Sequence, residues 1–345
     1  MAIKFGIIGT GIMGVAGGRI IQLMENAEIV ALAEPVMARL KPAANEFSVK
    51  AVFSDYREML EKEPLDAVYV ATPDTIHTDP VIDSLNAGCH VLVEKPMTTS
   101  QADSERVFDA VKRTGKKFQI NFNHRWLSPY HKIKEMISAG QLGEPIIGYA
   151  RKNNPIYVPT EMLASWAKHS SPAWFMSSHD IDLMTWWFDA IPVEVYARGV
   201  KRVLKQRDWD TYDGIQSMVT YDNGQFATFE AAWIYPNSSP YMPDSFMEVI
   251  GTSGSTQINR QAEAIDAIVE EKFVCPRTFL NYKVFEHWQG AMPACVKSFL
   301  YAIEHDTEPH VNVIDGVKNT AILDAIHRSL ASGKPEKITL SLIRS

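Results

Sequence analysis

The first strand-like run of the chain leads directly into a glycine-rich turn. Residues 3–8, IKFGII, are followed at once by GTGIMG at residues 9–14, which fits the pattern GxGxxG, and then by a helical pattern. Glycines at these positions allow a tight turn and a close approach of the backbone to a pyrophosphate at the N-terminus of a helix. This order predicts a dinucleotide-binding unit whose cofactor contacts are Gly9, Gly11, Ile12, Met13 and Gly14.

Short apolar runs continue to alternate with amphipathic stretches through the first third of the chain. The runs are IKFGIIG, EIVALAE, DAVYVAT, HVLVEKP and KFQINF, with helical patterns between them. This alternation is typical of βαβ units and predicts an α/β domain with a doubly wound parallel sheet, a Rossmann fold. We expect this dinucleotide-binding domain to cover residues 1–122.

The second predicted strand ends at an acidic residue, Glu34. A carboxylate at this place can accept hydrogen bonds from the hydroxyls of the adenosine ribose. Pro35 and Val36 follow it, so no arginine or lysine is immediately placed to hold a 2′-phosphate. The sequence therefore favours NAD over NADP as the cofactor.

After residue 122 the pattern changes to extended segments with few helices between them. These segments are IIGYARK, VEVYARGVKRV, IQSMVTY, QFATFEAAW and FMEVIG, and two helical stretches follow at about 290–305 and 315–332. Residues 222–224, Asp-Asn-Gly, favour a tight hairpin between two of the segments. We expect residues 123–345 to form an α+β substrate-binding domain with a mostly antiparallel, open-faced sheet. An exposed apolar sheet face invites self-association, so we expect a homodimer or homotetramer.

The composition excludes several classes of protein. Among 345 residues, 22% are charged and 46% hydrophobic, and no apolar run approaches the ~20 residues that span a bilayer. A net charge of −7 is unlike that of a nucleic-acid binder. The three cysteines, Cys89, Cys275 and Cys295, are too few and too far apart for a disulfide framework or a CxxC metal cluster. We expect a cytoplasmic protein with a small-molecule partner, and neither a membrane nor a nucleic acid.

Further motifs lie at the ends of later strands. Thr72-Pro73 ends the fourth predicted strand and Glu94-Lys95-Pro96 ends the fifth, at the carboxyl edge where open α/β sheets bind ligands. Together with the glycine turn, His77, NFNHRW, HDID and DGVKNTAILDAIHRSLASGK, these motifs resemble the Gfo/Idh/MocA family of NAD(P)-dependent sugar and polyol oxidoreductases.

The resemblance implies roles for the residues at these strand ends. It places Lys95 beside the nicotinamide and the substrate, as a catalytic residue. The other implied cofactor contacts are Thr72, Pro73, His77, Glu94 and Asn123. His124 and Arg125 are candidate cofactor or substrate contacts, although Arg125 could equally form a structural ion pair.

The stretch SSPAWFMSSHDIDLMTWW, residues 170–187, combines a histidine with two aspartates among aromatic residues. Helical spacing places Phe175, His179, Asp182, Leu183 and Trp186 on roughly one face, whereas Asp180 points elsewhere. His179 and Asp182 have the spacing HxxD, but no further cysteine or histidine is suitably placed nearby, so we expect no metal site.

Members of the family typically carry a DxxxHxxD pattern here, in which the histidine contacts the reacting hydroxyl and the first aspartate assists it. In this chain Phe175 stands where that first aspartate would be. The resemblance therefore implies an acid–base set reduced to His179 and Lys95, with Trp174 and Phe175 as further substrate contacts. Asp182 is expected to support the helix or orient a neighbour.

The leading interpretation is an enzyme that moves a hydride between the nicotinamide and a secondary alcohol or ketone of a sugar, polyol or related cyclic compound. His179 would act as general base, since its unperturbed pKa suits proton transfer near neutrality, and Lys95 would stabilise the developing alkoxide. Two alternatives remain. One is a non-catalytic dinucleotide-binding regulator or sensor, and the other is an enzyme that uses bound NAD during glycoside cleavage.

Overall fold

The computed structural model describes residues 2–285, 287–340 and 342, which group into two compact units. The first unit takes the described residues within 1–126 and 281–317, and the second takes those within 127–280 and 318–345. The boundary between the two groups of residues falls inside one long helix, between Val317 and Lys318. The domain limits at residues 122 and 123 stay a prediction.

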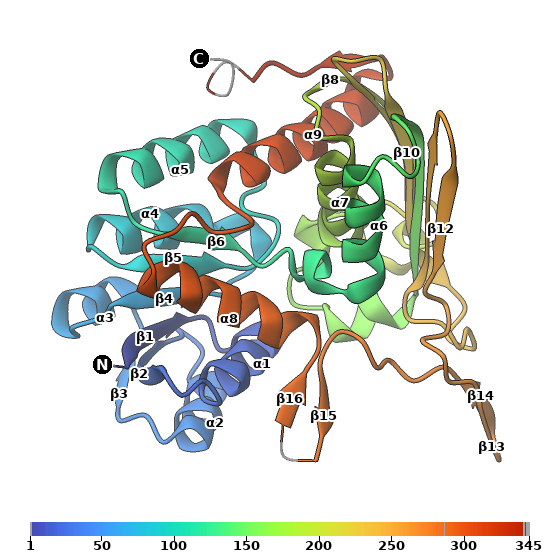
Figure 1. The fold of residues 1–345 in the computed structure, drawn as a ribbon. Helices are drawn as coiled ribbons and strands as arrows, with labels where there is room; N and C mark the ends of the chain where they lie inside the picture. Colours follow the sequence, from blue (N-terminus) through green and yellow to red (C-terminus); the bar gives the residue numbers. More distant parts are fainter. Residues whose placement is uncertain (1, 286, 341, 343–345) are drawn as a thin grey trace. The chain divides into compact units, whose positions relative to one another are not determined.

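The first unit is built on a parallel sheet with the strand order β3-β2-β1-β4-β5-β6 (Figure 1). Its strands are β1 (Ile3–Ile8), β2 (Ala27–Ala33), β3 (Ala51–Phe53), β4 (Ala67–Val70), β5 (His90–Val93) and β6 (Phe118–Ile120). Strand β1 pairs with β2 on one side and with β4 on the other, so the chain changes direction across the sheet between β1 and β4. Ligands bind outside the carboxyl ends of strands at such a switch point. The predicted doubly wound sheet is confirmed.

Five helices connect these strands: α1 (Ile12–Ile21), α2 (Met37–Phe47), α3 (Tyr56–Lys62), α4 (Thr78–Asn86) and α5 (Gln101–Thr114). The unit also contains α8 (Ala291–Glu304), from much later in the chain, and the short 3₁₀ turns η1 (Asp74–Ile76) and η2 (Asn123–Trp126). Local sequence sets their ends. The Ser100 hydroxyl caps α5 by accepting from the backbone N–H of Asp103, and Gly115 ends that helix with φ +63°.

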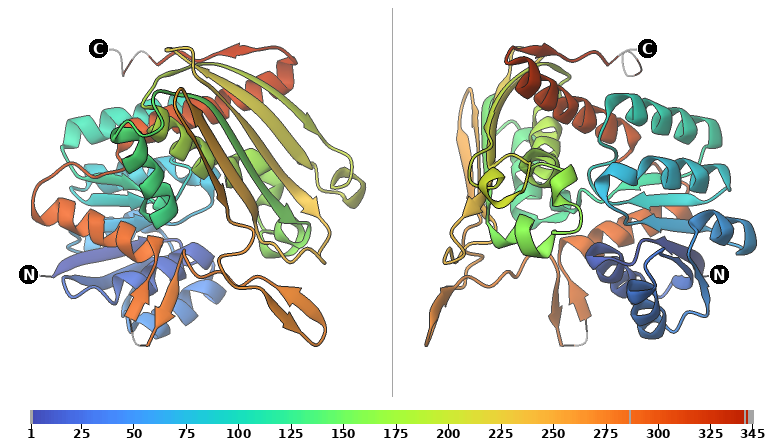
Figure 2. Two further views of the ribbon diagram at one scale, coloured as in Figure 1. Left: turned by 45° about the vertical axis from the view of Figure 1, so that its right-hand side comes forward. Right: turned by 180° about the vertical axis from the view of Figure 1, so that it is seen from behind.

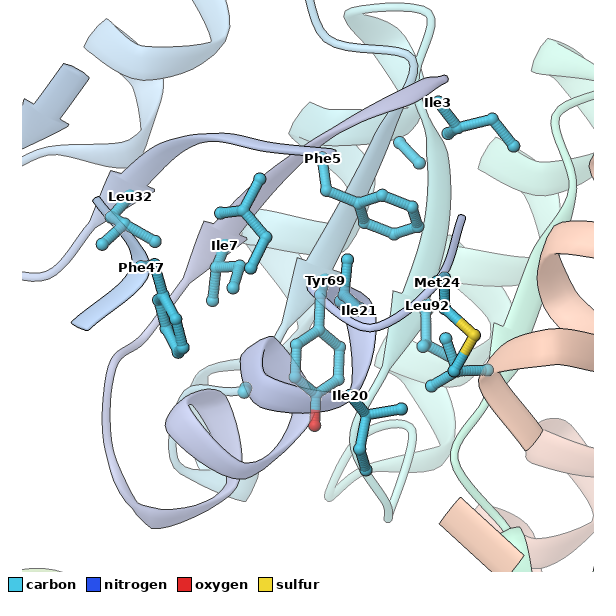
Figure 3. Close-up of a cluster of buried hydrophobic side chains, with 14 of the residues drawn as sticks. Ile3, Phe5, Ile7, Ile20, Ile21, Met24, Leu32, Phe47, Tyr69 and Leu92 are labelled. Atoms are coloured by element: carbon cyan, nitrogen blue, oxygen red, sulfur yellow. The ribbon is translucent and has the colours of Figure 1, made fainter. Parts of the chain in front are cut away.

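The core of the first unit lies between β1 and the helices α1, α2 and α8 (Figure 3). Phe5 and Ile7 on β1 are fully buried, and the Phe5 ring meets that of Phe299 on α8 with centroids 6.4 Å apart. The sequence pattern predicts that residues 290–305 belong to the second domain. Helix α8 instead packs in the first unit, because its apolar side chains Val296 and Phe299 complete this core.

The second unit is built on a mixed sheet with the strand order β12-β11-β7-β10-β9-β8-β17. Its strands are β7 (Pro145–Pro155), β8 (Pro192–Val200), β9 (Gly214–Tyr221), β10 (Phe226–Tyr235), β11 (Asp244–Gly251), β12 (Ser255–Asn259) and β17 (Glu336–Lys337). Strands β7 and β10 are parallel, and the other neighbouring pairs are antiparallel. The predicted hairpin at residues 222–224 joins β9 to β10, and Gly224 has the positive φ of +86° that its turn requires.

Helices of the second unit pack on one face of this sheet (Figure 2). They are α6 (Ser128–Ser138), α7 (Ser178–Phe188) and most of α9 (Val313–Ser332), with short turns η3 (Val158–Met162), η4 (Ala167–His169), η5 (Ala173–Ser177) and η6 (Lys205–Arg207). Helix α7 lies close to the sheet because Gly148 on β7 leaves room for Met184. A Cβ atom at residue 148 would lie 2.4 Å from the Met184 sulfur.

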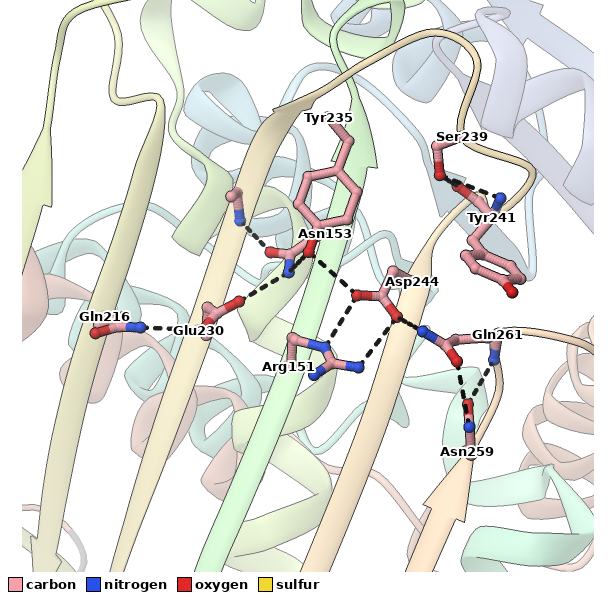
Figure 4. Close-up of polar contacts among 11 residues, drawn as sticks. Arg151, Asn153, Gln216, Glu230, Tyr235, Ser239, Tyr241, Asp244, Asn259 and Gln261 are labelled. Atoms are coloured by element: carbon pink, nitrogen blue, oxygen red, sulfur yellow. Dashed lines mark hydrogen bonds and ion pairs between the residues drawn. The ribbon is translucent and has the colours of Figure 1, made fainter.

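The other face of the sheet carries polar and half-exposed apolar side chains (Figure 4). Arg151 forms an ion pair with Asp244, and Asn153 donates to Glu230 and to the Tyr235 hydroxyl. Within the described chain, no helix of this unit covers this face in the views of Figure 2. The α+β class and the open-faced sheet are thus confirmed.

Two small hairpins complete the described structure. They are β13 (Ala267–Val269) with β14 (Lys272–Val274), and β15 (Tyr282–Val284) with β16 (His287–Gln289). In the described part of the chain, we find no helix that is both long and apolar enough to cross a membrane.

Candidate active site

The glycine turn has the geometry that its sequence predicts. Gly9 adopts a positive φ of +91°, and a Cβ atom there would lie 2.7 Å from the carbonyl oxygen of Ala71. A Cβ atom on Gly14 would lie 1.9 Å from the Gly9 carbonyl oxygen, so a side chain at either position would force the backbone apart. Above Gly11, by contrast, a Cβ atom would have no described atom within 4 Å beyond its chain neighbours. The turn is therefore packed tightly against the protein at Gly9 and Gly14, and it has open space beside Gly11 at the N-terminus of α1.

The acidic residue at the end of β2 is tied to this turn. The carboxylate of Glu34 is 5% exposed, and its two oxygens accept hydrogen bonds from the backbone N–H groups of Thr10, at 2.9 Å, and Val36, at 3.1 Å. The Thr10 hydroxyl is buried and has no hydrogen-bond partner among the described residues. An open glycine turn, an orphaned hydroxyl and a fixed carboxylate fit a dinucleotide. The predicted cofactor contacts Ile12 and Met13 follow Gly11 in sequence, and their side chains are 63% and 38% exposed.

The turns after β4 and β5 are joined through one histidine. His77 is 1% exposed, and its ring nitrogens lie near two backbone carbonyl oxygens: Nε2 is 2.9 Å from Thr72 and Nδ1 is 2.8 Å from Pro96. The predicted residues Thr72, Pro73, His77 and Lys95 are thus brought together at the carboxyl edge of the sheet. Lys95 is half-buried.

Glu94 lies in a buried polar network beneath this edge. Its Oε1 atom accepts hydrogen bonds from the Tyr69 hydroxyl at 2.5 Å and from the Asn121 amide at 2.6 Å. Burial and the neighbouring Glu94 carboxylate raise the pKa of Tyr69 well above its ordinary value, so the phenol keeps its proton and donates. The Glu94 side chain, expected to contact the cofactor, is 5% exposed and holds the start of the Lys95 turn.

The three residues after β6 are all buried in η2. Asn123, His124 and Arg125 are 5%, 5% and 6% exposed, and the Oδ1 atom of Asn123 has no hydrogen-bond partner among the described residues. The Arg125 guanidinium donates to Asp315 Oδ1 at 2.8 Å and to the His310 carbonyl at 3.1 Å. Of the two alternatives for Arg125, this geometry supports the structural ion pair.

In the second unit, the predicted helix around His179 has two parts. Residues 173–177 form a wide π-helical turn, η5, and α7 continues as an α-helix from Ser178. The spacing of an α-helix therefore does not hold between Phe175 and His179, which the sequence analysis placed on one face. Asp182 and Leu183 are buried, whereas His179 and Trp186 are half-buried.

The aromatic side chains before His179 pack against other rings. The ring centroid of Phe175 lies 5.8 Å from that of Trp166 and 6.4 Å from that of Trp233. Trp174 is 7% exposed and stacks on His327 of α9, with centroids 5.0 Å apart and an interplanar angle of 14°. One face of Trp174 is thus covered by protein, while Phe175 remains half-exposed at the edge of its cluster.

A buried ion pair beside His179 was not predicted. Lys152 on β7 donates from Nζ to Asp180 Oδ1 on α7, and the two side chains are 4% and 2% exposed. Burial lowers the pKa of Lys152, and the attraction of Asp180 opposes that shift. The signal available in the sequence was the alternation of β7, which places Lys152 on the same face as the buried Ala150.

The candidate residues thus form two sets, each within one unit. The nucleotide-binding set and Lys95 belong to the first unit, and Trp174, Phe175 and His179 belong to the second. Among the described residues, no group of three or more histidine, cysteine, aspartate or glutamate side chains is arranged to hold a metal ion.

Comparison with known proteins identifies related sequences along nearly the whole chain. The model of an oxidoreductase family with an NAD-binding Rossmann fold matches residues 3–122, and the C-terminal alpha/beta domain of that oxidoreductase family matches residues 134–340. The scyllo-inositol 2-dehydrogenase (NAD(+)) of Bacillus subtilis is 27% identical over 343 residues, covering 97% of this chain and 96% of the relative.

Solved structures share the same fold. The crystal structure of scyllo-inositol dehydrogenase from Lactobacillus casei with bound NAD(H) and scyllo-inositol has a TM-score of 0.84 at 22% identity, covering 98% of this chain and 99% of the other. That of myo-inositol 2-dehydrogenase from Lactobacillus plantarum has a TM-score of 0.85 at 23% identity, covering 98% and 100%. With both parts of the family model matched in order, the chain belongs to the Gfo/Idh/MocA family of oxidoreductases, as its motifs predicted.

Proposed function

We propose that this chain is an NAD-dependent dehydrogenase that interconverts a secondary alcohol and a ketone on an inositol-like polyol or a related cyclic sugar. The observation that carries this proposal is its similarity, along 97% of its length, to a scyllo-inositol 2-dehydrogenase. The open glycine turn and the polar strand ends of the first unit support the cofactor assignment, and the half-buried His179 and Lys95 supply proton-handling groups.

The residues of the chain divide the work as follows. When bound, NAD accepts or returns the hydride. His179 removes the proton of the substrate hydroxyl as general base, and returns it in the reverse direction. The Lys95 ammonium stabilises the alkoxide that develops on the same oxygen. The turn that carries Lys95 is held by buried contacts on both sides, which keep that charge in a defined place.

One observation favours a second candidate function, a dinucleotide-binding sensor without turnover. Phe175 provides no carboxylate to orient His179 or bind a sugar hydroxyl, and its ring packs between Trp166 and Trp233. A sensor, however, has no need for both His179 and Lys95. A glycoside-cleaving enzyme would use bound NAD for a transient oxidation and return the hydride in the same turnover, so no reduced nicotinamide would accumulate.

The direct test is to mix the protein with NAD and a panel of polyols that includes scyllo-inositol and myo-inositol. Accumulation of reduced nicotinamide, followed by its absorbance, is the expected result for at least one polyol. Lys95→Ala provides the control, since it should abolish most of this signal. NAD binding without reduction by any polyol or sugar of the panel would contradict the dehydrogenase and favour one of the two alternatives.

We expect NAD(H) to bind more tightly than NADP(H), by about tenfold or more, equivalent to ~1.4 kcal/mol. The fixed Glu34 carboxylate accepts hydrogen bonds from ribose hydroxyls but repels a 2′-phosphate. Glu34→Ala should narrow the gap between the two affinities, measured by calorimetry. Glu34→Gln keeps an oxygen acceptor for Thr10 and removes the charge, so it should narrow the gap as well. Tighter binding of NADP to the unmodified protein would reverse the assignment.

We also expect assembly into a dimer or tetramer through the open face of the second sheet. Tyr149 and Phe246 are half-exposed on this face, with ring centroids 6.1 Å apart, and Met218 on it is 42% exposed. Phe246→Glu should dissociate the assembly at micromolar concentration, measured by light scattering. Val52→Glu, on the edge strand of the first sheet, provides the control and should leave it intact. A monomeric unmodified protein would contradict this prediction.

A further inference from the structure

His77 occupies an unusual place between two turns of the first unit. It precedes α4 directly, and its ring lies between the carbonyl of Thr72, in the turn after β4, and the carbonyl of Pro96, in the turn after β5. Both contacts, at 2.9 and 2.8 Å, are of hydrogen-bond length, and the side chain is 1% exposed. Both nitrogens of the ring therefore face protein atoms. This is the arrangement of a brace within the protein and leaves neither nitrogen directed at a ligand.

The chemistry of the two contacts is asymmetric. A carbonyl oxygen only accepts, and a neutral imidazole carries a single N–H, so a neutral ring can donate to one of the two carbonyls. The second contact becomes a hydrogen bond when both ring nitrogens carry hydrogen. Each nitrogen thus governs a separate contact, with Nδ1 facing the Lys95-Pro96 turn and Nε2 facing the Thr72-Pro73 turn.

Lys95 lies directly between two residues that are held in place. On its N-terminal side, Glu94 accepts hydrogen bonds from Tyr69 and Asn121. On its C-terminal side, Pro96 is contacted through its carbonyl by His77. Removal of the His77 contact would release the Pro96 end of the segment 94–96. The Glu94 end would stay fixed by Tyr69 and Asn121.

We propose that His77 is a positioning residue that holds the Lys95 turn against the Thr72 turn and so sets the place of the Lys95 ammonium. The family resemblance implied a direct cofactor contact for His77. The consequence for catalysis rests on the proposed function, because it assumes that Lys95 works at the nicotinamide and the substrate. A displacement of about 1 Å at a catalytic group can cost ~10²-fold in rate.

Three substitutions separate the two contacts of the ring. His77→Asn keeps an amide donor close to the place of Nδ1 and can still reach Pro96, whereas His77→Gln keeps one close to the place of Nε2 and can still reach Thr72. His77→Phe removes both donors and keeps the bulk. We expect turnover to fall about 10- to 100-fold in the Phe variant and to be restored more fully by Asn than by Gln. Equal turnover of the Asn and Gln variants would overturn the proposal.

A second measurement tests whether His77 acts through Lys95. If it does, His77→Phe should lower turnover no further in a Lys95→Ala background, because the group that it positions is already gone. Independent, multiplicative losses would contradict the proposal. His90→Asn provides a matched control: His90 lies at the opposite end of β5, accepts a hydrogen bond from the Lys117 N–H, and should leave turnover unchanged when replaced.

A binding measurement separates this proposal from the proposed function. ADP-ribose lacks the nicotinamide, so a displaced Lys95 turn should weaken NAD about tenfold in the Phe variant while ADP-ribose affinity stays within twofold, as calorimetry would show. This comparison needs no turnover and remains valid if no polyol is oxidised. Equal weakening of both ligands, or of neither, would overturn the role of His77 whatever the reaction.

Discussion

His179→Ala is expected to lower turnover by roughly 10²–10⁴-fold while NAD affinity stays nearly unchanged. This is the usual effect of removing one positioned acid–base group. His179 lies at the start of α7 and is half-buried, whereas the glycine turn, Glu34 and the Thr72 turn all belong to the other unit. The loss should therefore appear in turnover with the best polyol substrate, and calorimetry with NAD should show little change.

The matched control for this experiment is His131→Ala. His131 is an exposed histidine of the same unit, on α6, whose ring centroid lies 5.9 Å from that of Trp186. We expect its replacement to leave turnover unchanged. Full activity of His179→Ala on the true substrate would show that the histidine is a core residue and that the proposed mechanism is wrong.

Features that depend on neighbours in sequence could be predicted. The glycine turn follows from three glycines at the junction of a strand and a helix, and the structure gives steric reasons for Gly9 and Gly14. The hairpin at residues 222–224 and the change from a parallel to a mostly antiparallel sheet were predicted for the same reason, because turn residues and strand alternation are local signals.

The direction of a side chain at a strand end could not be predicted. The motifs predicted that the turns carrying His77 and Glu94 lie at the carboxyl edge of the sheet, and the family resemblance implied that both residues contact the cofactor, which stays a prediction. In the structure His77 contacts two backbone carbonyls, and Glu94 binds Tyr69 and Asn121. Whether such a polar side chain points outward or contacts the protein depends on partners 5 to 27 positions away, and three of these four partners lie outside its own local motif.

Long-range partners were the other failure of sequence-based prediction. Helix α8 lies in sequence between β12 and β17 of the second sheet, yet its apolar face completes the core of the first unit. Lys152 and Asp180 are separated by 28 residues, and their pairing requires both the alternation of β7 and the rotation of α7. The π-helical turn η5 changes that rotation by widening the helix just before His179.

Breaking the Lys152–Asp180 pair is expected to lower the free energy of unfolding by about 3–5 kcal/mol, because one charge would be left buried without its partner. Both side chains are almost fully inaccessible, and the attraction of Asp180 opposes the effect of burial on the pKa of Lys152. Lys152→Met takes the ammonium away from the buried Asp180 carboxylate, and Asp180→Leu takes the carboxylate away from the buried Lys152 ammonium. Denaturant unfolding of each variant measures the loss.

The double variant Lys152→Met/Asp180→Leu distinguishes a charge effect from a packing effect. Replacing a buried ion pair by apolar residues of similar size is often close to neutral, so the double variant should recover most of the stability that either single change loses. Lys201→Met, which breaks the more exposed pair with Asp210, should change the denaturation midpoint little. If the losses of the two single variants simply added, the pair would contribute through packing, and its charges would not be the reason that α7 is held against β7.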